Sequence, residues 1–141
     1  MLTKAVRKYL ARYASPHVEL ANHVRRRFAH VVVVPVRDES PVFVEGLWPA
    51  LGDATLLVIV TNHTTDSSAR VIQRNRAVAR ALAGDPRVLF VELTIDPREG
   101  VGRARRVGCD IALALYAQEK LACDWIFTTD ADVVLPADYL A

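Results

Sequence analysis

Four short apolar runs alternate with longer segments of helical periodicity, and this alternation constrains the fold more than any other feature of the sequence. The runs cover residues 31–34, 54–60, 87–93 and 123–129. The unbroken valine run at 31–34 is typical of a strand buried on both faces. Strands that alternate with helices form a parallel sheet with helices on both sides. We therefore predict an α/β fold with an open, mainly parallel sheet, preceded by N-terminal helices.

Local signals mark where the connecting helices begin and end. Ser40 followed by Pro41 is a helix start, because the hydroxyl caps the first turn and a proline loses nothing at the first position. We expect this helix to be short, since a glycine and Pro49 interrupt it. A polar loop over residues 61–68 precedes the next helix. The last helix is long, and Gln118 is the polar residue that interrupts its apolar side.

The charge of the chain is unevenly distributed. Residues 1–27 hold seven basic residues against Glu19 alone, a charge of +6, whereas the remainder holds 11 basic and 15 acidic residues, a charge of −4. We therefore divide the 141 residues into a basic helical segment, 1–28, and an α/β domain, 29–141. Nucleic-acid binding would require a basic patch on the folded body among aromatic residues that stack on bases, so we expect no nucleic-acid partner.

The basic segment has two interpretations. Over residues 2–13, apolar side chains recur at helical spacing with basic residues elsewhere on the helix, which indicates a docking helix. The alternative is a peripheral membrane contact through residues 1–28, with a basic amphipathic helix lying on anionic lipid. The sequence has no apolar stretch of membrane-spanning length and no signal-peptide pattern. We expect a cytoplasmic protein, located at the cytoplasmic face of the membrane if this segment binds lipid.

Two carboxylates, Asp130 and Asp132, follow the last apolar run. Side chains two residues apart in an extended segment point the same way, so both carboxylates could face one cation. Mg²⁺ takes one or two carboxylates and completes its shell with water and substrate phosphates. Ligands of open α/β sheets bind beyond the carboxyl ends of the strands, which places a divalent-cation site here. A solvated turn is the alternative, and it would account for an isolated Asp-x-Asp.

The loops that follow parallel strands meet at one edge of the sheet. Here they are residues 35–39, 61–66, 94–106 and 130–132. Together they offer carboxylates, a loop rich in hydroxyls and amides for a polar ring or ribose, and a glycine-rich basic helix start. Such a helix start suits a diphosphate, although its arginines taken alone would be a solvated helix face. It is not a dinucleotide fingerprint, because Arg105 stands where the third glycine would be.

In this order the fragments resemble those of family 2 glycosyltransferases, which have the GT-A fold. Residues 31–39 are similar to the family's first strand and loop, and residues 58–68 to its second strand and acidic loop. Residues 100–108 are similar to its Gly/Ala-Arg-Asn helix start, and Thr129-Asp130-Ala131-Asp132 with residues 135–140 to its metal motif and exit. The resemblance implies the Rossmann-like half of that fold over nearly the whole chain after the basic segment.

The resemblance also implies a nucleotide-diphosphate sugar as donor and Mg²⁺ or Mn²⁺ as cofactor. By position, Asp132 would bind the metal, and Asp130 would hold the ribose or bind the metal through water. Arg105 would contact the diphosphate. The other donor-binding residues would be Pro35, Glu39, Thr61, Asn62 and Asp66.

The chain departs from the family pattern at several positions. Thr61 stands where the family has an aspartate, His63 replaces a glycine, and Arg106 replaces an asparagine. The family's acceptor site and general base follow the metal motif, whereas this chain stops nine residues beyond Asp132. We therefore assign no general base and expect a donor-binding half, with apolar surface that favours self-association.

Two other functions compete with glycosyl transfer. A non-catalytic nucleotide-sugar-binding module, or an inactive remnant without its acceptor half, would account for the missing base. A phosphatase of the haloacid-dehalogenase type would use the first aspartate of an Asp-x-Asp as its nucleophile. In those phosphatases the motif normally ends the first strand of the fold, and here it ends the last, so this function ranks third.

Overall fold

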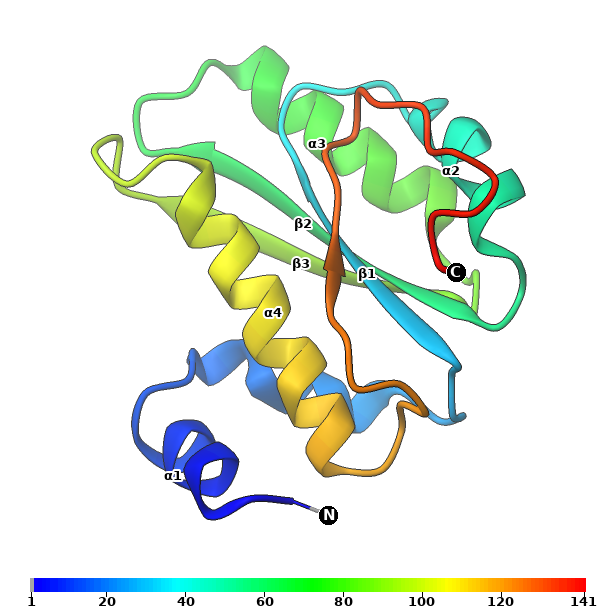
Figure 1. The fold of residues 1–141 in the computed structure, drawn as a ribbon. Helices are drawn as coiled ribbons and strands as arrows, with labels where there is room; N and C mark the ends of the chain where they lie inside the picture. The colour runs from blue at the N-terminus through cyan, green and yellow to red at the C-terminus, as the bar shows by residue number, and fades with distance from the viewer. Residues whose placement is uncertain (1) are drawn as a thin grey trace.

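The structure is a computed structural model that describes residues 2–141. Its centre is a four-stranded sheet in the order β3-β2-β1-β4, and every neighbouring pair of strands is parallel (Figure 1). The expected open α/β fold with a parallel sheet is confirmed. The strands are β1 (His30–Val36), β2 (Thr55–Thr64), β3 (Val88–Ile95) and β4 (Phe127–Thr128).

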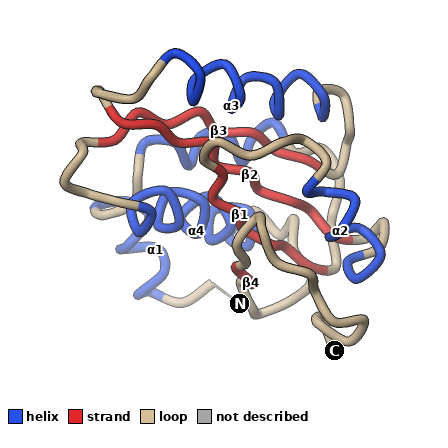
Figure 2. The backbone as a smooth tube through the Cα atoms, turned by 90° about the horizontal axis from the view of Figure 1, so that it is seen from above, coloured by secondary structure: helices blue, strands red, loops and turns tan. Residues whose placement is uncertain are grey.

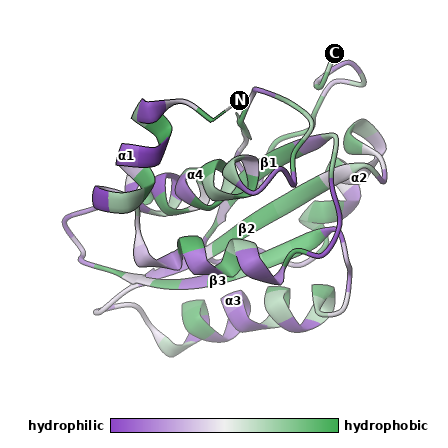
Figure 3. Cartoon of the chain, turned by 90° about the horizontal axis from the view of Figure 1, so that it is seen from below, coloured by the Kyte–Doolittle hydropathy of each residue, from purple (hydrophilic) through white to green (hydrophobic). Residues whose placement is uncertain are grey.

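Helices cover both faces of this sheet (Figure 2). One face packs against α4 and the N-terminal helices, and the other against α2, α3 and the C-terminal segment. The strands between these layers are mainly hydrophobic (Figure 3). The helices are α1 (Lys4–Arg12), the 3₁₀ helix η1 (Pro16–His23), α2 (Phe43–Leu51), α3 (Ala69–Leu82) and α4 (Val101–Ala117).

The valine run of β1 lies at the centre of the fold. All four residues of Val31–Val34 are fully buried, with alternate side chains in the two core layers. β1 is hydrogen-bonded to β2 on one side and to β4 on the other, so neither of its edges is open along the paired residues. β-Branched side chains suit such a strand because they fill both faces of the pleat.

Helix α4 approaches the sheet closely because it carries glycine at the crossing point. A Cβ atom on Gly108 would lie 2.3 Å from Cγ1 of Val33 and 3.1 Å from Cγ2 of Val60. Both distances are too short for a packed methyl group, so any larger residue would push the helix away from the sheet. The close approach fixes the orientation of α4 on the sheet, and so the position of its N-terminal end at the edge of the sheet.

The basic N-terminal segment packs on α4 through a buried carboxylate. Asp110 is 3% exposed; its Oδ1 accepts a hydrogen bond of 2.6 Å from the Tyr9 hydroxyl, and its Oδ2 one of 2.9 Å from the Ser15 N–H. The hydrogen bond to Asp110, together with burial, raises the pKa of Tyr9. Because burying a carboxylate is costly unless it is hydrogen-bonded, these contacts anchor α1 in one place.

Several element boundaries differ from the sequence-based expectations. α2 has Val42 at its N-cap position, without a side-chain hydrogen bond to the cap, so Ser40 and Pro41 precede the helix instead of starting it. β2 continues through the predicted polar loop to Thr64, because its residues from Thr61 onward pair with β3. α2 runs through Pro49, where the missing N–H removes only the bond to the carbonyl of the exposed Glu45. α4 ends at Ala117, so Gln118 caps the helix instead of interrupting its apolar side.

The last apolar run pairs with the sheet over two residues only. Phe127 and Thr128 oppose Val32 and Val33 of β1. Upstream, Trp125 is 75% exposed, and downstream Val134 is 88% exposed, so the expectation of self-association rests on this surface. A membrane-crossing helix would need a longer and more apolar stretch than any helix formed by residues 2–141.

Candidate functional site

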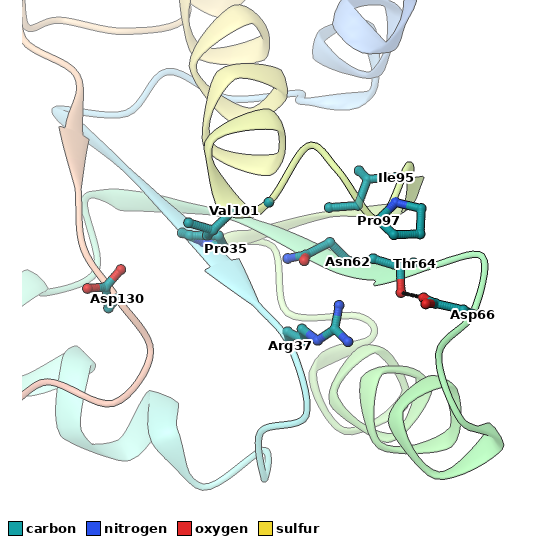
Figure 4. Close-up of a pocket in the computed structure, with 10 residues that line it drawn as sticks. Pro35, Arg37, Asn62, Thr64, Asp66, Ile95, Pro97, Val101 and Asp130 are labelled. Atoms are coloured by element: carbon teal, nitrogen blue, oxygen red, sulfur yellow. Dashed lines mark hydrogen bonds between the residues drawn. The ribbon is translucent and has the colours of Figure 1, made fainter.

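A cleft of about 420 Å³ opens at the carboxyl ends of the strands (Figure 4). Its volume lies within the usual range of small-molecule sites, roughly 300–1,000 Å³. The lining comes from the ends of β1, β2 and β3, the start of α4 and the segment after β4. The lining combines apolar residues, charged residues of both signs and an amide, among them Pro35, Arg37, Asn62, Asp66, Val101 and Asp130.

The sequence-predicted residues divide between this cleft and its surroundings. Pro35, Asn62, Asp66 and Asp130 line the cleft together. Arg105 does not line it but contacts Asp130. The other three predicted residues are Glu39, Thr61 and Asp132, and they lie outside the cleft lining.

Asn62 presents an acceptor to the cleft. The residue is 3% exposed, and its Nδ2 donates to the carbonyl of Val36 over 3.1 Å. This donation fixes the orientation of the amide, because Nδ2 must face the carbonyl. Oδ1 is then left as an acceptor for an N–H or O–H group of a ligand.

Thr61 faces the sheet interior. It is 3% exposed, and its hydroxyl donates to the carbonyl of Val91 over 3.2 Å. The extension of β2 beyond the predicted strand end explains this position, since Thr61 is paired with Glu92 of β3. Its hydroxyl therefore stabilises the sheet and is not free to bind a nucleoside.

A hydroxyl-rich turn forms the wall next to Asp66. The Thr64 hydroxyl donates to the Asp66 carboxylate, and the Thr64 N–H donates to the Ser67 hydroxyl over 2.9 Å. The Arg37 guanidinium reaches the same hydroxyl at 3.4 Å. Helix α3 then begins with Ser68 at its N-cap position, and no side chain hydrogen-bonds to the cap.

A buried asparagine of α3 holds two walls of the cleft together, and sequence reasoning missed it. Asn75 is 2% exposed; its Nδ2 donates to the carbonyl of Asn62 over 2.8 Å, and its Oδ1 accepts from the Asp38 N–H over 3.0 Å. The signal was present in the sequence, because Asn75 falls between Val71 and Val78 on the apolar stripe of the helix.

The loop after β1 has an unusual backbone conformation that α3 stabilises. Asp38 has a φ of +56°, in the left-handed region that few non-glycine residues adopt. Arg74 lies 2.8 Å from the Asp38 carboxylate and donates to the Asp38 carbonyl over 3.2 Å. With the Asn75 contact, these interactions fix the residue that follows Arg37, and hence the place of Arg37 in the cleft wall.

The N-terminal end of α4 faces the cleft. Gly100 has a φ of +60° and leads into the helix, and no side chain caps the first turn. Gly100 and Val101 both line the cleft. The open N–H groups and the helix dipole favour an anion at this point.

Arg105 lies one helical turn after Val101 and forms an ion pair with Asp130. Its Nη2 is 2.6 Å from Oδ1 of Asp130, and both side chains are partly exposed. Its Nε is buried and has no hydrogen-bond partner among the described residues. A buried donor without an acceptor is costly, but Nε itself is covered, so an anion would contact the exposed part of the Arg105 side chain.

The two carboxylates of the Asp-x-Asp face different hollows. The chain turns at Ala131, which is 7% exposed, so the segment is not extended and the expected common direction is not observed. Asp130 lines the cleft, whereas Asp132 and Glu39 line a second hollow of about 320 Å³. Within residues 2–141, no three His, Cys, Asp or Glu side chains are grouped closely enough to hold a metal by themselves.

Comparisons of the chain with protein-family models, with curated proteins and with solved structures found no match. The resemblance to glycosyltransferases therefore rests on the four sequence fragments alone. What the cleft can bind has to be argued from its own geometry and chemistry.

Proposed function

We propose that the cleft binds a nucleotide-diphosphate sugar and that the chain takes part in glycosyl transfer from this donor. The observation that carries the proposal is the convergence of four chemically different groups at one end of the sheet. They are the Asn62 amide, the N-terminal end of α4, the Arg105–Asp130 pair and the polar turn at Asp66. Ligands of open α/β sheets bind at this end of the strands.

The wall formed by β1 and β2 suits the nucleoside. Pro35 and Ile95 supply apolar surface, and Asn62 supplies an acceptor of fixed orientation. Asp66 and the Thr64 hydroxyl can hydrogen-bond the hydroxyls of a ribose. Apolar lining with a few fixed polar groups is the usual composition of a cofactor or substrate site.

The wall formed by α4 suits the diphosphate. The first turn of the helix has uncapped N–H groups at Gly100 and Val101, which line the cleft. Arg105 adds a partly exposed guanidinium beside the cleft, next to Asp130. An arginine and a helix N-terminus together give an anion both charge and directed hydrogen bonds.

A divalent cation fits the donor set through Asp130. The ion pair with Arg105 uses Oδ1 of Asp130 and leaves Oδ2 for an ion, and one carboxylate is enough when phosphates and water complete the shell. Asp132 would join it only if the turn at Ala131 opened. When bound, the ion would neutralise charge on the departing nucleoside diphosphate.

We assign no general base. Asp66 and Asp130 are the two carboxylates that line the cleft among residues 2–141, and both belong to the donor-binding walls. Asp138, the next acidic residue after Asp132, lies in an exposed turn. We therefore assign the residues that line the cleft to binding and orienting the donor, and none of them to activating an acceptor.

A non-catalytic binding module is the second candidate, and two observations favour it. Asp130 is neutralised by Arg105, and Asp132 faces another hollow. Neither carboxylate is then required to bind a metal, as expected for a cleft that binds nucleotides without one. Catalytic turnover separates the two candidates: hydrolysis of a nucleotide-diphosphate sugar at ordinary enzyme rates would exclude the binding module.

Calorimetry with uridine and guanosine diphosphates tests the proposal. Arg105→Ala should weaken binding by about 1.5–3 kcal/mol, or roughly 10- to 150-fold, the range for a hydrogen bond to a charged group. Arg103→Ala is the matched control, because Arg103 lies on the same helix and pairs with Glu99 outside the cleft lining. If neither diphosphate binds the wild-type chain, or if both variants bind alike, the assignment of the cleft fails.

Metal dependence is tested with the two aspartates separately. We expect Mg²⁺ to strengthen diphosphate binding to the wild-type chain, and Asp130→Asn to remove that gain. Asp132→Asn should remove it only if the turn at Ala131 opens on binding. Equal affinity of the wild-type chain with and without Mg²⁺ or Mn²⁺ would exclude a role for the metal.

A further inference from the structure

The four basic residues of α1 lie on one side of the helix. Lys4, Arg7, Lys8 and Arg12 follow each other at intervals of three, one and four residues, and all four are exposed. Such intervals place side chains along one helix face. We call this surface the basic face of α1. Figure 3 shows α1 as largely hydrophilic, in contrast to the strands of the sheet.

The opposite side of α1 is already occupied. Tyr9 is hydrogen-bonded to Asp110 of α4, and Leu10 packs against the core cluster beneath that helix. Tyr9 and Leu10 are therefore not free to enter a membrane, as the amphipathic-helix interpretation would require, although Tyr13 at the end of the helix is 56% exposed. What the folded chain presents outward is charge, on a helix that is held in place.

The basic face has no carboxylate partner in the part of the chain that the structure describes. Every ion pair among residues 2–141 involves an arginine at position 74 or beyond, and none involves a basic residue of the N-terminal segment. Six of the 11 basic residues of the α/β domain have such a partner, whereas none of the four on the basic face of α1 does. The basic face can therefore bind an external anionic surface.

We infer that the basic face of α1 binds the surface of an anionic lipid bilayer. Clusters of four to eight Lys or Arg on a helix are attracted to anionic headgroups, each residue contributing roughly fivefold to the binding constant, so four residues contribute on the order of 10³-fold. Ala5 and Ala11 are the small residues between the cations, which leaves the charges close to a flat surface. The inference does not depend on the function proposed for the cleft.

Nucleic acid fits this face less well. Sequence-independent binding of a single strand uses a groove with aromatic rings on which bases stack. Tyr9 is turned toward Asp110, and Tyr13, 56% exposed, is the one exposed tyrosine near the end of the helix. An exposed helix that carries charges but no aromatic surface for base stacking is better suited to a lipid bilayer, whose charged headgroups are spread over a flat surface.

Membrane binding through α1 would leave the cleft accessible. The hollow lined by Leu2 and Ala117 places the start of α1 near the C-terminal end of α4, whereas the cleft lies at Gly100 and Val101, at the other end of that helix (Figure 1). A protein docked through α1 would therefore still admit a ligand to the cleft. Vesicle binding and nucleotide binding should be independent of each other.

Vesicle co-sedimentation tests the inference with full-length variants. Lys4→Glu combined with Lys8→Glu reverses two charges of the basic face. Glutamate is favourable in the first turn, where Lys4 lies, and is a good helix former at Lys8, so α1 should still form. Arg70→Glu combined with Arg80→Glu is the matched control, because both arginines are exposed on α3 and have no ion pair among the described residues. Each variant is compared with the wild type on vesicles of phosphatidylcholine alone and with about one-third phosphatidylserine.

We expect the wild type and the α3 variant to bind only the vesicles that contain phosphatidylserine. The α1 variant should bind at least tenfold more weakly, and raising the salt concentration to shorten the screening length should weaken the wild type further. Equal losses in both variants, binding to neutral vesicles or salt-independent binding would overturn the inference. Tighter binding to single-stranded RNA than to vesicles at the same salt concentration would assign the face to nucleic acid instead.

Discussion

Replacing Asn75 by alanine should destabilise the fold and loosen the cleft together. Asn75 is 2% exposed and makes two hydrogen bonds to backbone groups, at 2.8 Å to Asn62 and 3.0 Å to Asp38. Leaving a buried polar group without its partner costs about 1–3 kcal/mol, and less where the group is partly exposed, as Asp38 is. We expect a total loss of about 2–4 kcal/mol in the free energy of unfolding. This is a large part of the 5–15 kcal/mol that is usual for a domain.

Urea unfolding followed by tryptophan fluorescence measures this loss, since the Trp48 ring lies 3.8 Å from the Arg87 guanidinium and this contact is lost on unfolding. Gln73→Ala on the exposed side of the same helix is the control and should change stability by less than about 0.5 kcal/mol. Diphosphate binding should also fall in the Asn75 variant, because the Arg37 wall is no longer held. A loss of stability below about 1 kcal/mol, or unchanged binding, would refute the bridging role of Asn75.

Two further predictions concern the packing of α4. Gly108→Ala should cost about 1–3 kcal/mol of stability, because the added methyl forces α4 away from Val33. Gly46→Ala in α2, where the added methyl meets no neighbouring atom within 4 Å, should instead gain up to about 1 kcal/mol. Thermal unfolding measures both changes, and equal effects would contradict the close approach of α4 to the sheet. The hydrogen bond to Asp110 raises the pKa of Tyr9, so its stabilising effect is complete below the ordinary tyrosine pKa and is lost as the pH rises through the raised value. Wild-type stability should therefore fall at alkaline pH more steeply than that of Tyr9→Phe, and parallel pH profiles would contradict this.

The fold was predictable because its signals are local and repeated. The signals are the fully buried run at Val31–Val34 and the alternation of apolar and amphipathic segments. Each can be recognised from the hydrophobic period of one element alone. These properties leave few possible topologies. The end of β2 was not predictable, because Thr61–Thr64 are polar residues whose strand conformation depends on pairing with β3. Pairing of this kind joins residues distant in the sequence.

The candidate site was predictable in its location and only partly in its residues. The order of the strands brings Pro35, Asn62 and Asp130 to one cleft, as the positions of the loops required. The sequence by itself thus determined which chemical groups gather at this end of the sheet. It also determined the uneven charge that leaves the N-terminal segment basic.

Tertiary structure alone decided which of these groups are free to act. Thr61 is withdrawn into the sheet by its bond to Val91, and the turn at Ala131 separates the two aspartates that a sequence pattern places together. Asn75 joins two cleft walls only because α3 packs across them. The physical reason is that each of these positions depends on contacts with a segment distant in the sequence. Local sequence sets the period of an element, whereas strand pairing places Thr61 and the packing of α3 places Asn75.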